Sequence, residues 1–247
     1  MIFKDLKGGR FYNEDCFDAM KDIPDGVIDM VLCDLPYGTT QNKWDSVLPL
    51  DKLWAEYWRV CKPNAAIVLT AQTPFDKLLG ASQIQYLKYE WIWEKTEASG
   101  HLNAKIQPMK AHENVLVFYR EQCNYFPQKI KAKAVKIVQK SANGSSNYGD
   151  QTPTTYESDE RYPRSVQLIS KDNKNKKIHP TQKPVALFEY LIKTYTNENE
   201  IILDNTAGSG TTAIAAINTN RKWVCIDSDT KEGYYTKAIE RIEVHDA

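Results

Sequence analysis

Short runs of β-branched and aliphatic residues alternate with amphipathic stretches along most of the chain, and this alternation restricts the fold more than any other feature. Residues 27–33 form an almost unbroken apolar run between a Pro-Asp-Gly turn and Pro36, which is typical of a buried strand. Residues 50–61 carry apolar side chains at helical spacing, and residues 65–70 read as a second buried strand. Strands that alternate with helices predict an α/β fold, with a mostly parallel sheet that is doubly wound by helices on both faces.

The same alternation of strands and helices continues along the rest of the chain, apart from residues 121–178. We expect further helices from about residue 75 and over residues 185–195, 212–218 and 231–242, and further strands over residues 89–93, 115–119, 201–203 and 223–226. Residues 121–178 break the pattern, because they are rich in Lys, Ser, Asn, Thr and Gly and have weak periodicity. We therefore predict an α/β half over residues 1–120, an inserted and partly flexible region over residues 121–178, and a second α/β half over residues 179–247.

Composition excludes several classes of protein. A 247-residue chain that is 42% hydrophobic and 26% charged is neither wholly disordered nor fibrous. No run approaches the ~18 apolar residues of a membrane span, and the first residues lack the apolar core of a signal peptide. The five cysteines are widely spaced and form no C-x-x-C pair, which argues against a disulfide framework and a zinc site. We expect a protein of the reducing cytoplasm with no bound metal.

The charges are balanced overall but unevenly distributed. The chain has 32 basic and 32 acidic residues, whereas the 121–178 segment has eleven Lys and Arg against six Asp and Glu, a local excess of +5. A basic segment is a place where phosphate contacts are readily built, although a charge run by itself is more often a solvated loop.

The stretch from 201 to 212 reads as a strand, a loop of small residues and the start of a helix. Glycines at Gly208 and Gly210 let a ligand approach the backbone, and the helix N-terminus presents free N–H groups. Asp227 follows the next predicted strand, where a carboxylate accepts hydrogen bonds from ribose hydroxyls. These features indicate a nucleoside site, with both NAD and S-adenosylmethionine open as ligands; a phosphate-binding P-loop is absent.

A second polar segment, Asp34-Leu35-Pro36-Tyr37, directly follows the 27–33 strand. A carboxylate, a rigid turn and an aromatic ring thus stand together at the carboxyl end of a sheet strand, where ligand sites of α/β proteins lie. Taken alone, the segment is equally consistent with a turn that ends the strand.

In combination, these segments resemble the DNA amino-methyltransferases. The Asp-Leu-Pro-Tyr segment is similar to their D-P-P-Y catalytic motif, and the stretch from Asp204 to Gly210 is similar to their S-adenosylmethionine loop. Residues 179–184, His-Pro-Thr-Gln-Lys-Pro, match a further signature, and residues 13–16, Asn-Glu-Asp-Cys, match an N-x-D-C segment. The order, with the catalytic motif first, a basic insertion next and the cofactor loop last, resembles the β group, and the likeness spans nearly the whole chain except the insertion.

The resemblance implies a Rossmann-like S-adenosylmethionine-dependent methyltransferase fold. It makes residues 1–120 the catalytic half, residues 121–178 a small inserted target-recognition region and residues 179–247 the cofactor-binding half. It implies that Asp34 and the carbonyl of Leu35 accept the two N–H bonds of a flipped-out adenine amine, while Pro36 shapes the turn and Tyr37 stacks on the base. The chain departs from the family pattern at Leu35, where proline is usual, and at residues 205–207, where Pro-Phe-x is common. The cofactor-binding residues that it implies are Asp15, Cys16, Asp34, His179, Thr181, Gln182, Lys183, Asp204, Ala207, Gly208, Ser209, Gly210, Thr211, Asp227 and Ser228.

The insertion falls where the target-recognition region of the β group belongs. Its aromatic residues interleave with cationic ones, and the candidate DNA-binding residues are Lys129, Lys131, Lys133, Arg161 and Arg164. Each single one of them is more simply a phosphate contact than a reader of a base.

The resemblance predicts a site-specific, adenine-specific DNA methyltransferase of a restriction-modification type, encoded by a bacterium or a phage. Double-stranded DNA is the expected partner, and a homodimer and a cognate restriction endonuclease are further candidates. Cytosine-N4 methylation is the first alternative, although that activity usually goes with Ser in place of Asp34. RNA methylation, a catalytically silent DNA-binding relative and a Rossmann oxidoreductase are the others. The tripeptide from Glu113 to Val115 matches one of cytosine-C5 methyltransferases, but no cysteine follows a proline, so we treat it as a coincidence.

Overall fold

The structure is a computed structural model of the 247-residue chain. It describes residues 2–40, 42, 45–141, 143–145, 149–172, 178–179, 181–228 and 233–246. The chain divides into two compact units, the first formed by residues 1–126 and 165–247 and the second by residues 127–164.

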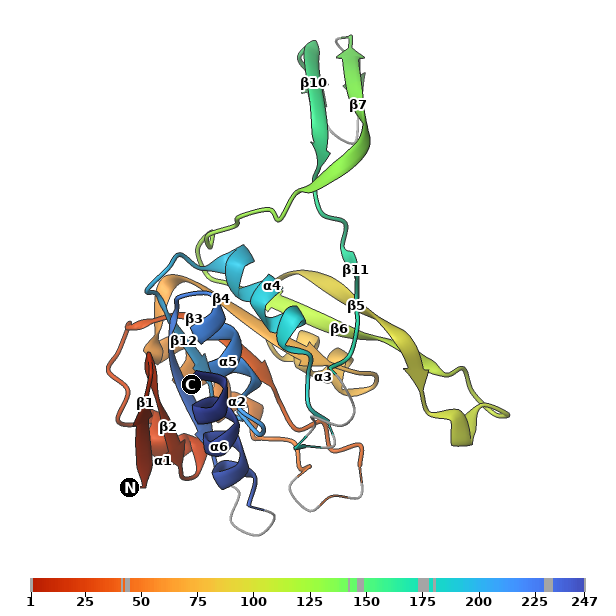
Figure 1. Ribbon diagram of the computed structural model, residues 1–247. Coiled ribbons are helices and arrows are strands. Elements are labelled where there is room, and N and C mark those ends of the chain that lie inside the picture. Colours follow the sequence, from red (N-terminus) through yellow and green to blue (C-terminus); the bar gives the residue numbers. More distant parts are fainter. Residues whose placement is uncertain are drawn as a thin grey trace. The chain divides into compact units, whose positions relative to one another are not determined.

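The first unit is built on a nine-stranded sheet (Figure 1). In spatial order its strands are β1 (Phe3–Leu6), β2 (Gly9–Asn13), β13 (Lys222–Asp227), β12 (Ile201–Asp204), β3 (Ile28–Asp34), β4 (Cys61–Ala71), β6 (Lys110–Phe118), β5 (Leu87–Ser99) and β11 (Val166–Ile169). The five spatially consecutive strands β2, β13, β12, β3 and β4 are parallel to one another. Strand β6 is antiparallel to both of its neighbours, and β11 is parallel to β5. The predicted mostly parallel sheet is confirmed.

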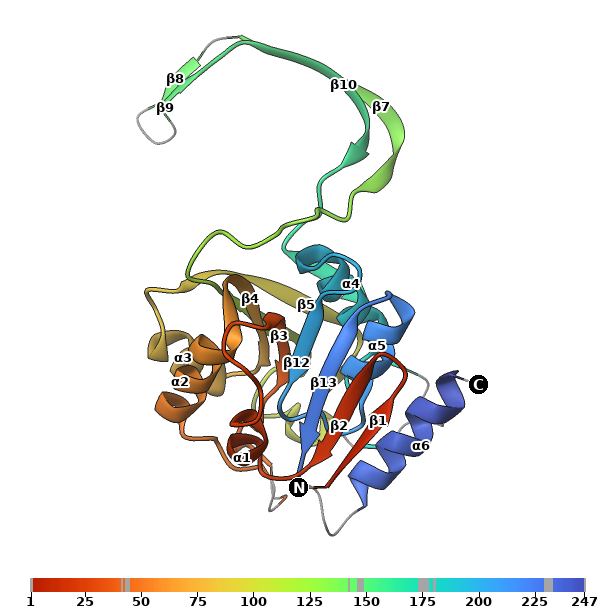
Figure 2. The ribbon, with the colours of Figure 1, turned by 90° about the vertical axis from the view of Figure 1, so that its left-hand side faces the viewer.

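Helices cover both faces of this sheet (Figure 2). One face packs against α1 (Cys16–Met20), α2 (Leu50–Val60) and α3 (Phe75–Ser82), and the other against α4 (Val185–Tyr195), α5 (Thr211–Asn218) and α6 (Tyr234–Asp246). The alternation of side chains along β3 supplies both cores, because Met30 and Leu32 face α4 while Val31 and Cys33 face α2. The predicted doubly wound architecture is therefore confirmed.

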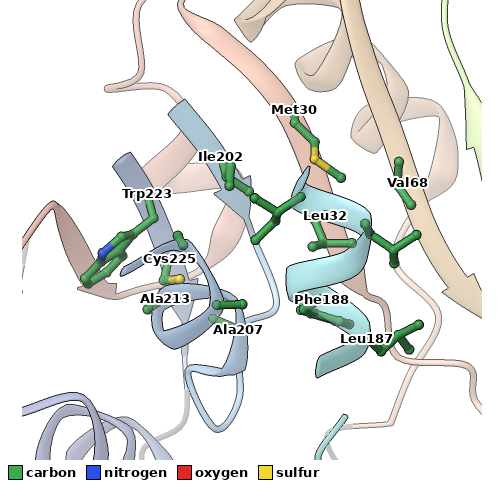
Figure 3. Packing of buried hydrophobic residues seen from close by; sticks show 14 of the residues in the cluster. Met30, Leu32, Val68, Leu187, Phe188, Ile202, Ala207, Ala213, Trp223 and Cys225 are labelled. Atoms are coloured by element: carbon green, nitrogen blue, oxygen red, sulfur yellow. The ribbon is translucent and has the colours of Figure 1, made fainter. Parts of the chain in front are cut away.

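Figure 3 shows how the first of these cores is packed. Leu187 and Phe188 on α4 belong to the same cluster as Met30 and Leu32 on β3, and all four side chains are buried. Burying side chains of this size stabilises a fold by about 1.5–3 kcal/mol each. This packing holds β3 and β12 in place, and the loops at their carboxyl ends build the site.

Two parts of the sheet differ from the prediction. Strands β5 and β6 are longer than residues 89–93 and 115–119, because the strands extend as a hairpin into exposed positions where the apolar pattern fades. A short 3-10 helix, η1 (His101–Asn103), lies in the connection between them. The edge hairpin of β1 and β2 was not predicted, since β1 has exposed residues at three of its four positions and no clear period.

The second unit consists of two antiparallel pairs. Strand β7 (Ile130–Lys140) pairs with β10 (Thr154–Arg161), and β8 (Asn143–Ser145) pairs with β9 (Gly149–Gln151). The compact unit covers residues 127–164, a narrower range than the predicted insertion of residues 121–178. Residues 165–169 leave it to pair with β5, and the Phe126 amide donates to Thr194 O at 2.8 Å.

None of the helices in the described ranges is long and apolar enough to cross a membrane.

Candidate active site

Carboxylates stand at or just beyond the ends of four neighbouring parallel strands. Asp15 follows β2, Asp227 ends β13, Asp204 ends β12 and Asp34 ends β3, and these strands are consecutive in the sheet. Parallel neighbours end at the same edge, so the segments that the sequence singled out separately are brought together there. The Thr206 hydroxyl joins two of them by donating to Asp34 O at 3.1 Å.

The small-residue loop after β12 is held against the end of β13. The Ala207 amide donates to Ile226 O at 2.9 Å, and the Gly208 amide donates to Asp227 Oδ2 at 2.7 Å. Gly208 and Gly210 have φ angles of +49° and +71°, which L side chains rarely adopt. The predicted glycines are thus required by the backbone path that turns β12 into α5.

Two observations indicate that this edge fits a nucleoside. A side chain at Gly208 would meet only His179 Cδ2, at 4.0 Å, so open space borders the loop on that side. Glu14 Oε2, next to Asp15, is buried and makes no hydrogen bond within the described part of the chain. A ligand that donates hydrogen bonds, such as a ribose hydroxyl or an amine, would satisfy this acceptor.

Three predicted cofactor residues have side chains that face the protein interior. Asp204 is 3% exposed, and its carboxylate accepts from the Thr212 hydroxyl and from the Thr206 amide. Burial raises the pKa of Asp204 to about 7. The side chains of Ser209 and Thr211 are also buried. The predicted contacts of these three residues with a cofactor stay predictions, and they would have to be made by backbone atoms.

Arg241 on α6 supports the same loop and was missed from the sequence. Its guanidinium donates to Ser209 O at 2.9 Å and to the Thr211 hydroxyl at 3.1 Å. It also lies 3.8 Å from the carboxylate of Asp172. Arg241 lies at least 30 residues along the chain from Ser209 and Thr211, so no local sequence pattern indicates that it contacts them.

The N-x-D-C segment begins α1. Asp15 is exposed and caps the helix by accepting from the Phe17 amide at 2.9 Å, whereas the Cys16 side chain is buried. Burial raises the pKa of the Cys16 thiol to about 11. Ser228, just after β13, is exposed. Asp15 and Ser228 are accessible to a ligand, while the role predicted for Cys16 stays a prediction.

The His-Pro-Thr-Gln-Lys-Pro segment approaches the loop from the α4 side, with Pro180 outside the described residues. The Thr181 hydroxyl lies 3.0 Å from His179 Nδ1, and the His179 ring contacts Tyr234 edge to face. Gln182 is buried and donates to Asp172 Oδ2 at 3.2 Å. His179 therefore borders the open space beside Gly208, and Gln182 anchors the segment.

The catalytic candidate Asp34 accepts three hydrogen bonds from the protein. Its Oδ1 accepts from the Tyr37 hydroxyl at 2.6 Å and from the Thr70 hydroxyl, and its Oδ2 accepts from Lys183 Nζ at 2.7 Å. The Asp34 side chain is 22% exposed, whereas that of Lys183 is only 7% exposed. The carboxylate is thus fixed from inside and remains accessible from outside.

The rest of the Asp-Leu-Pro-Tyr segment forms the wall around this carboxylate. The Tyr37 ring stacks on Phe75 at 5.4 Å between centroids, and Lys183 Nζ lies 5.4 Å from the Tyr37 ring centroid. Leu35 is 3% exposed and packs into the core, so leucine fills the position where the family usually has proline. Pro36 is half-buried between them.

The loop that follows Tyr37 is folded around Asp45. Asp45 is 9% exposed and accepts from the amides of Gly38, Thr39 and Thr40 at 2.9, 3.0 and 2.6 Å. Burial acts to raise the pKa of Asp45, but the donors from Thr40, Gly38 and Thr39 outweigh it and lower the pKa. Asp45 therefore fixes the backbone next to the Asp-Leu-Pro-Tyr segment.

The candidate DNA-binding residues lie in or next to the second unit. Lys131 and Lys133 are exposed and two residues apart on β7, so they share one face of that strand. Lys129 pairs with Glu160 at 3.0 Å, and Arg161 donates to backbone carbonyls. Arg164 is exposed at the end of the unit.

No three His, Cys, Asp or Glu side chains gather within the described ranges in a way that could hold a metal ion. The five cysteines are buried and free.

The fold and the site together define an α/β protein in which the loop predicted to bind a nucleoside adjoins a fixed, accessible carboxylate. The family model for the N6 and N4 DNA methylases matches residues 28–240, and the chain therefore belongs to the DNA methylase family. The predicted resemblance is confirmed, and so is the predicted class of enzyme, a DNA methyltransferase with S-adenosylmethionine as its methyl donor.

Two curated relatives cover most of the chain. The type II methyltransferase M.HpaI of Haemophilus parainfluenzae is 27% identical over 250 residues, which are 95% of this chain and 74% of the relative. The DNA adenine methyltransferase YhdJ of Escherichia coli K12 is 27% identical over 262 residues, 95% of this chain and 85% of the relative.

Solved structures share the fold. The M1.HpyAVI complex with S-adenosylmethionine has a TM-score of 0.64 at 23% identity, covering 94% of this chain and 99% of that one. The cytosine-N4-specific PvuII DNA methyltransferase has a TM-score of 0.66 at 16% identity, covering 97% and 92%. These likenesses confirm the predicted methyltransferase fold.

Proposed function

We propose that this protein transfers the methyl group of S-adenosylmethionine to the N6 amine of an adenine flipped out of duplex DNA at a specific sequence. The observation that carries the proposal is Asp34, a fixed and partly exposed carboxylate directly beside the predicted cofactor loop. When bound, the cofactor supplies an electrophilic sulfonium methyl group.

Asp34 has room for a substrate amine. A carboxylate offers about four lone-pair positions, and the protein occupies two on Oδ1 and one on Oδ2. An N–H of the target amine can therefore be accepted at Oδ2 without loss of the internal partners. This acceptor would draw the amine out of conjugation with its ring. The nitrogen lone pair could then take up the methyl group as the methyl–sulfur bond breaks, and the amine would release one of its two protons to water.

The neighbouring residues complete the acceptor set and the base pocket. The Leu35 carbonyl takes the second N–H of the amine, and Pro36 restricts the turn that presents it. Tyr37 contacts the base; its ring is already braced by Phe75, so it is preorganised for stacking. Such stacking is worth about 1–3 kcal/mol per base, which offsets much of the roughly few kcal/mol needed to flip the base.

Adenine is favoured over cytosine by the identity of the first residue of the motif. Cytosine-N4 enzymes of this family usually carry Ser at the position of Asp34, and the relative YhdJ is named as an adenine methyltransferase. The PvuII enzyme, named as cytosine-N4-specific, shares the fold, so the fold itself does not distinguish the two bases.

Other predictions concern partners and location. We propose that Lys131 and Lys133 contact DNA phosphates, because both are exposed on one face of β7. A bacterial cytoplasm suits five free cysteines and a DNA substrate. A homodimer and a cognate restriction endonuclease stay predictions; the relatives M.HpaI and M.ScaI, both named type II methyltransferases, support the second.

The first experiment is incubation of unmethylated DNA with the protein and S-adenosylmethionine, followed by digestion to nucleosides and mass analysis. We expect 6-methyladenine, and 4-methylcytosine would overturn the assignment of the base. The Asp34→Ala variant should bind the cofactor but lose methyl transfer. Turnover within about a few-fold of wild type would refute the role of Asp34.

A further inference from the structure

Four charges of alternating sign lead from the core to the catalytic carboxylate. Lys95 Nζ on β5 lies 2.6 Å from Glu113 Oε1 on β6, and Glu113 Oε2 lies 3.1 Å from Lys183 Nζ. Lys183 Nζ in turn lies 2.7 Å from Asp34 Oδ2. The side chains of Lys95, Glu113 and Lys183 are 4%, 6% and 7% exposed, so only the Asp34 end of the series reaches solvent.

This arrangement is a costly way to stabilise a fold. Desolvation of a buried ion pair often cancels its Coulombic gain, and well-packed apolar residues of similar volume do as well or better. Glu113 nevertheless stays ionised: burial acts to raise its pKa, but the ammonium groups of Lys183 and Lys95 outweigh burial and lower the pKa to about 2. Lys183 stays protonated as well, because Asp34 and Glu113 overcome the effect of its burial and raise its pKa.

Lys183 is shared between two anions, and the sharing bears directly on the proposed chemistry. With Glu113 on its inner side, the ammonium donates to Asp34 from one direction and leaves the outer part of Oδ2 accessible. Without an anion at position 113, Asp34 would be the sole anionic partner of Lys183 in this series. The ammonium would then move onto the carboxylate and compete with the substrate amine for the same lone pairs.

We propose that Glu113 is a positioning residue for methyl transfer, which holds the Lys183 ammonium behind Asp34 so that Oδ2 remains available to the target amine. Lys95 is the counter-charge that lets Glu113 remain a buried anion. The inference rests on the proposed role of Asp34. It also gives a function to Glu113, which begins the tripeptide that the sequence by itself left as a coincidence.

The test compares Glu113→Gln, which removes the charge and keeps the shape, with Asp76→Asn as a matched control. Asp76 is also a buried carboxylate; it accepts from Asn114, the neighbour of Glu113, at 2.8 Å, and its ion pair is with Lys77 rather than Lys183. For each protein we would measure the single-turnover rate of methyl transfer to duplex DNA, the Kd values for S-adenosylmethionine and for DNA, and the Tm.

We expect Glu113→Gln to slow methyl transfer by about 10-fold or more while both Kd values stay within about twofold, since only the geometry at Asp34 changes. Asp76→Asn should lower the Tm but keep a rate near that of wild type. Glu113→Asp, which restores the charge on a shorter side chain, should recover part of the rate. If Glu113→Gln does not fold, the inference is tested by comparing the methyl-transfer rate of Glu113→Asp with that of wild type.

Three results would overturn the inference: a wild-type rate in Glu113→Gln, an equal loss of rate in Asp76→Asn, or a rate in Glu113→Asp no better than in Glu113→Gln. If Glu113→Gln is unfolded, a wild-type rate in Glu113→Asp overturns it too. These results are distinct from failure of the proposed function, which would appear as absence of a methylated base with the wild-type protein.

Discussion

Within the predicted cofactor loop, an added methyl group should lower the free energy of unfolding most at Gly210. Its φ of +71° lies in the left-handed region, where an L side chain costs about 1–2 kcal/mol. A Cβ there would also lie 3.0 Å from Ile242 Cδ1 and 3.5 Å from Ala238 Cβ on α6, both of which are buried. Overpacking of this kind costs about 1–3 kcal/mol, and the low end applies because the nearest atom is the end of a flexible side chain. We therefore expect Gly210→Ala to lower the free energy of unfolding by about 2–3 kcal/mol.

Gly208→Ala separates the two contributions. Gly208 also has a positive φ, +49°, but its nearest non-neighbouring atom would be His179 Cδ2 at 4.0 Å, so only the backbone strain applies. Its expected cost is about 1–2 kcal/mol. Adding Ile242→Val to Gly210→Ala removes the crowding methyl, so the double variant should lose at least about 0.5 kcal/mol less than the sum of the single losses.

Urea unfolding followed by circular dichroism would measure all four variants under one set of conditions. The reasoning is refuted if Gly210→Ala costs no more than Gly208→Ala, or if the effects of Gly210→Ala and Ile242→Val simply add. Either result would mean that α6 does not pack against the loop at this point.

Three further predictions concern pH, the loop after Tyr37 and DNA. The pKa of Asp204 is about 7 in the folded protein and ~3.9 in an unfolded chain, so ionisation of Asp204 opposes folding. The resulting loss of folding stability is absent below about pH 4, grows as pH rises and is complete above about pH 7. Asp204→Asn should therefore gain stability relative to wild type between about pH 5 and pH 8 in urea melts, and a pH-independent difference would contradict this. Asp45, whose pKa is lowered, stabilises the fold above its unfolded pKa of ~3.9, and this contribution is lost as pH falls through its folded pKa. Asp45→Ala should cost about 1–3 kcal/mol at neutral pH, and a destabilisation that persists unchanged at low pH would count against the three backbone hydrogen bonds as its cause. Replacing Lys131 and Lys133 by Gln should weaken binding to all duplexes and reduce the slope of log K against log salt by about 2 in fluorescence anisotropy, whereas an unchanged slope would show that neither contacts phosphate.

The sequence was sufficient for much of the fold, and the polar segments that it singled out after β3 and β12 follow neighbouring strands of the sheet. The apolar runs at β3 and β12 are local patterns, so they could be identified without knowledge of their neighbours. Because parallel strands end at one edge, the segments after β3 and β12 meet there, and the Thr206 hydroxyl donates to Asp34 O. The bounds of the insertion could not be predicted in this way, since residues 165–169 belong to the first unit only through pairing of β11 with β5.

What the sequence determined by itself is the set of motifs, their order and the strands and helices that carry them, because a period of two or 3.6 residues is written into a short stretch of chain. Only the tertiary structure decided which side chains meet. Lys183 reaches Asp34 across 149 residues, and Glu113, whose tripeptide looked accidental, stands behind Lys183 because β6 happens to lie beside β4. Charges pair according to distance and burial, and both are set by which strands become neighbours in the sheet rather than by spacing along the chain.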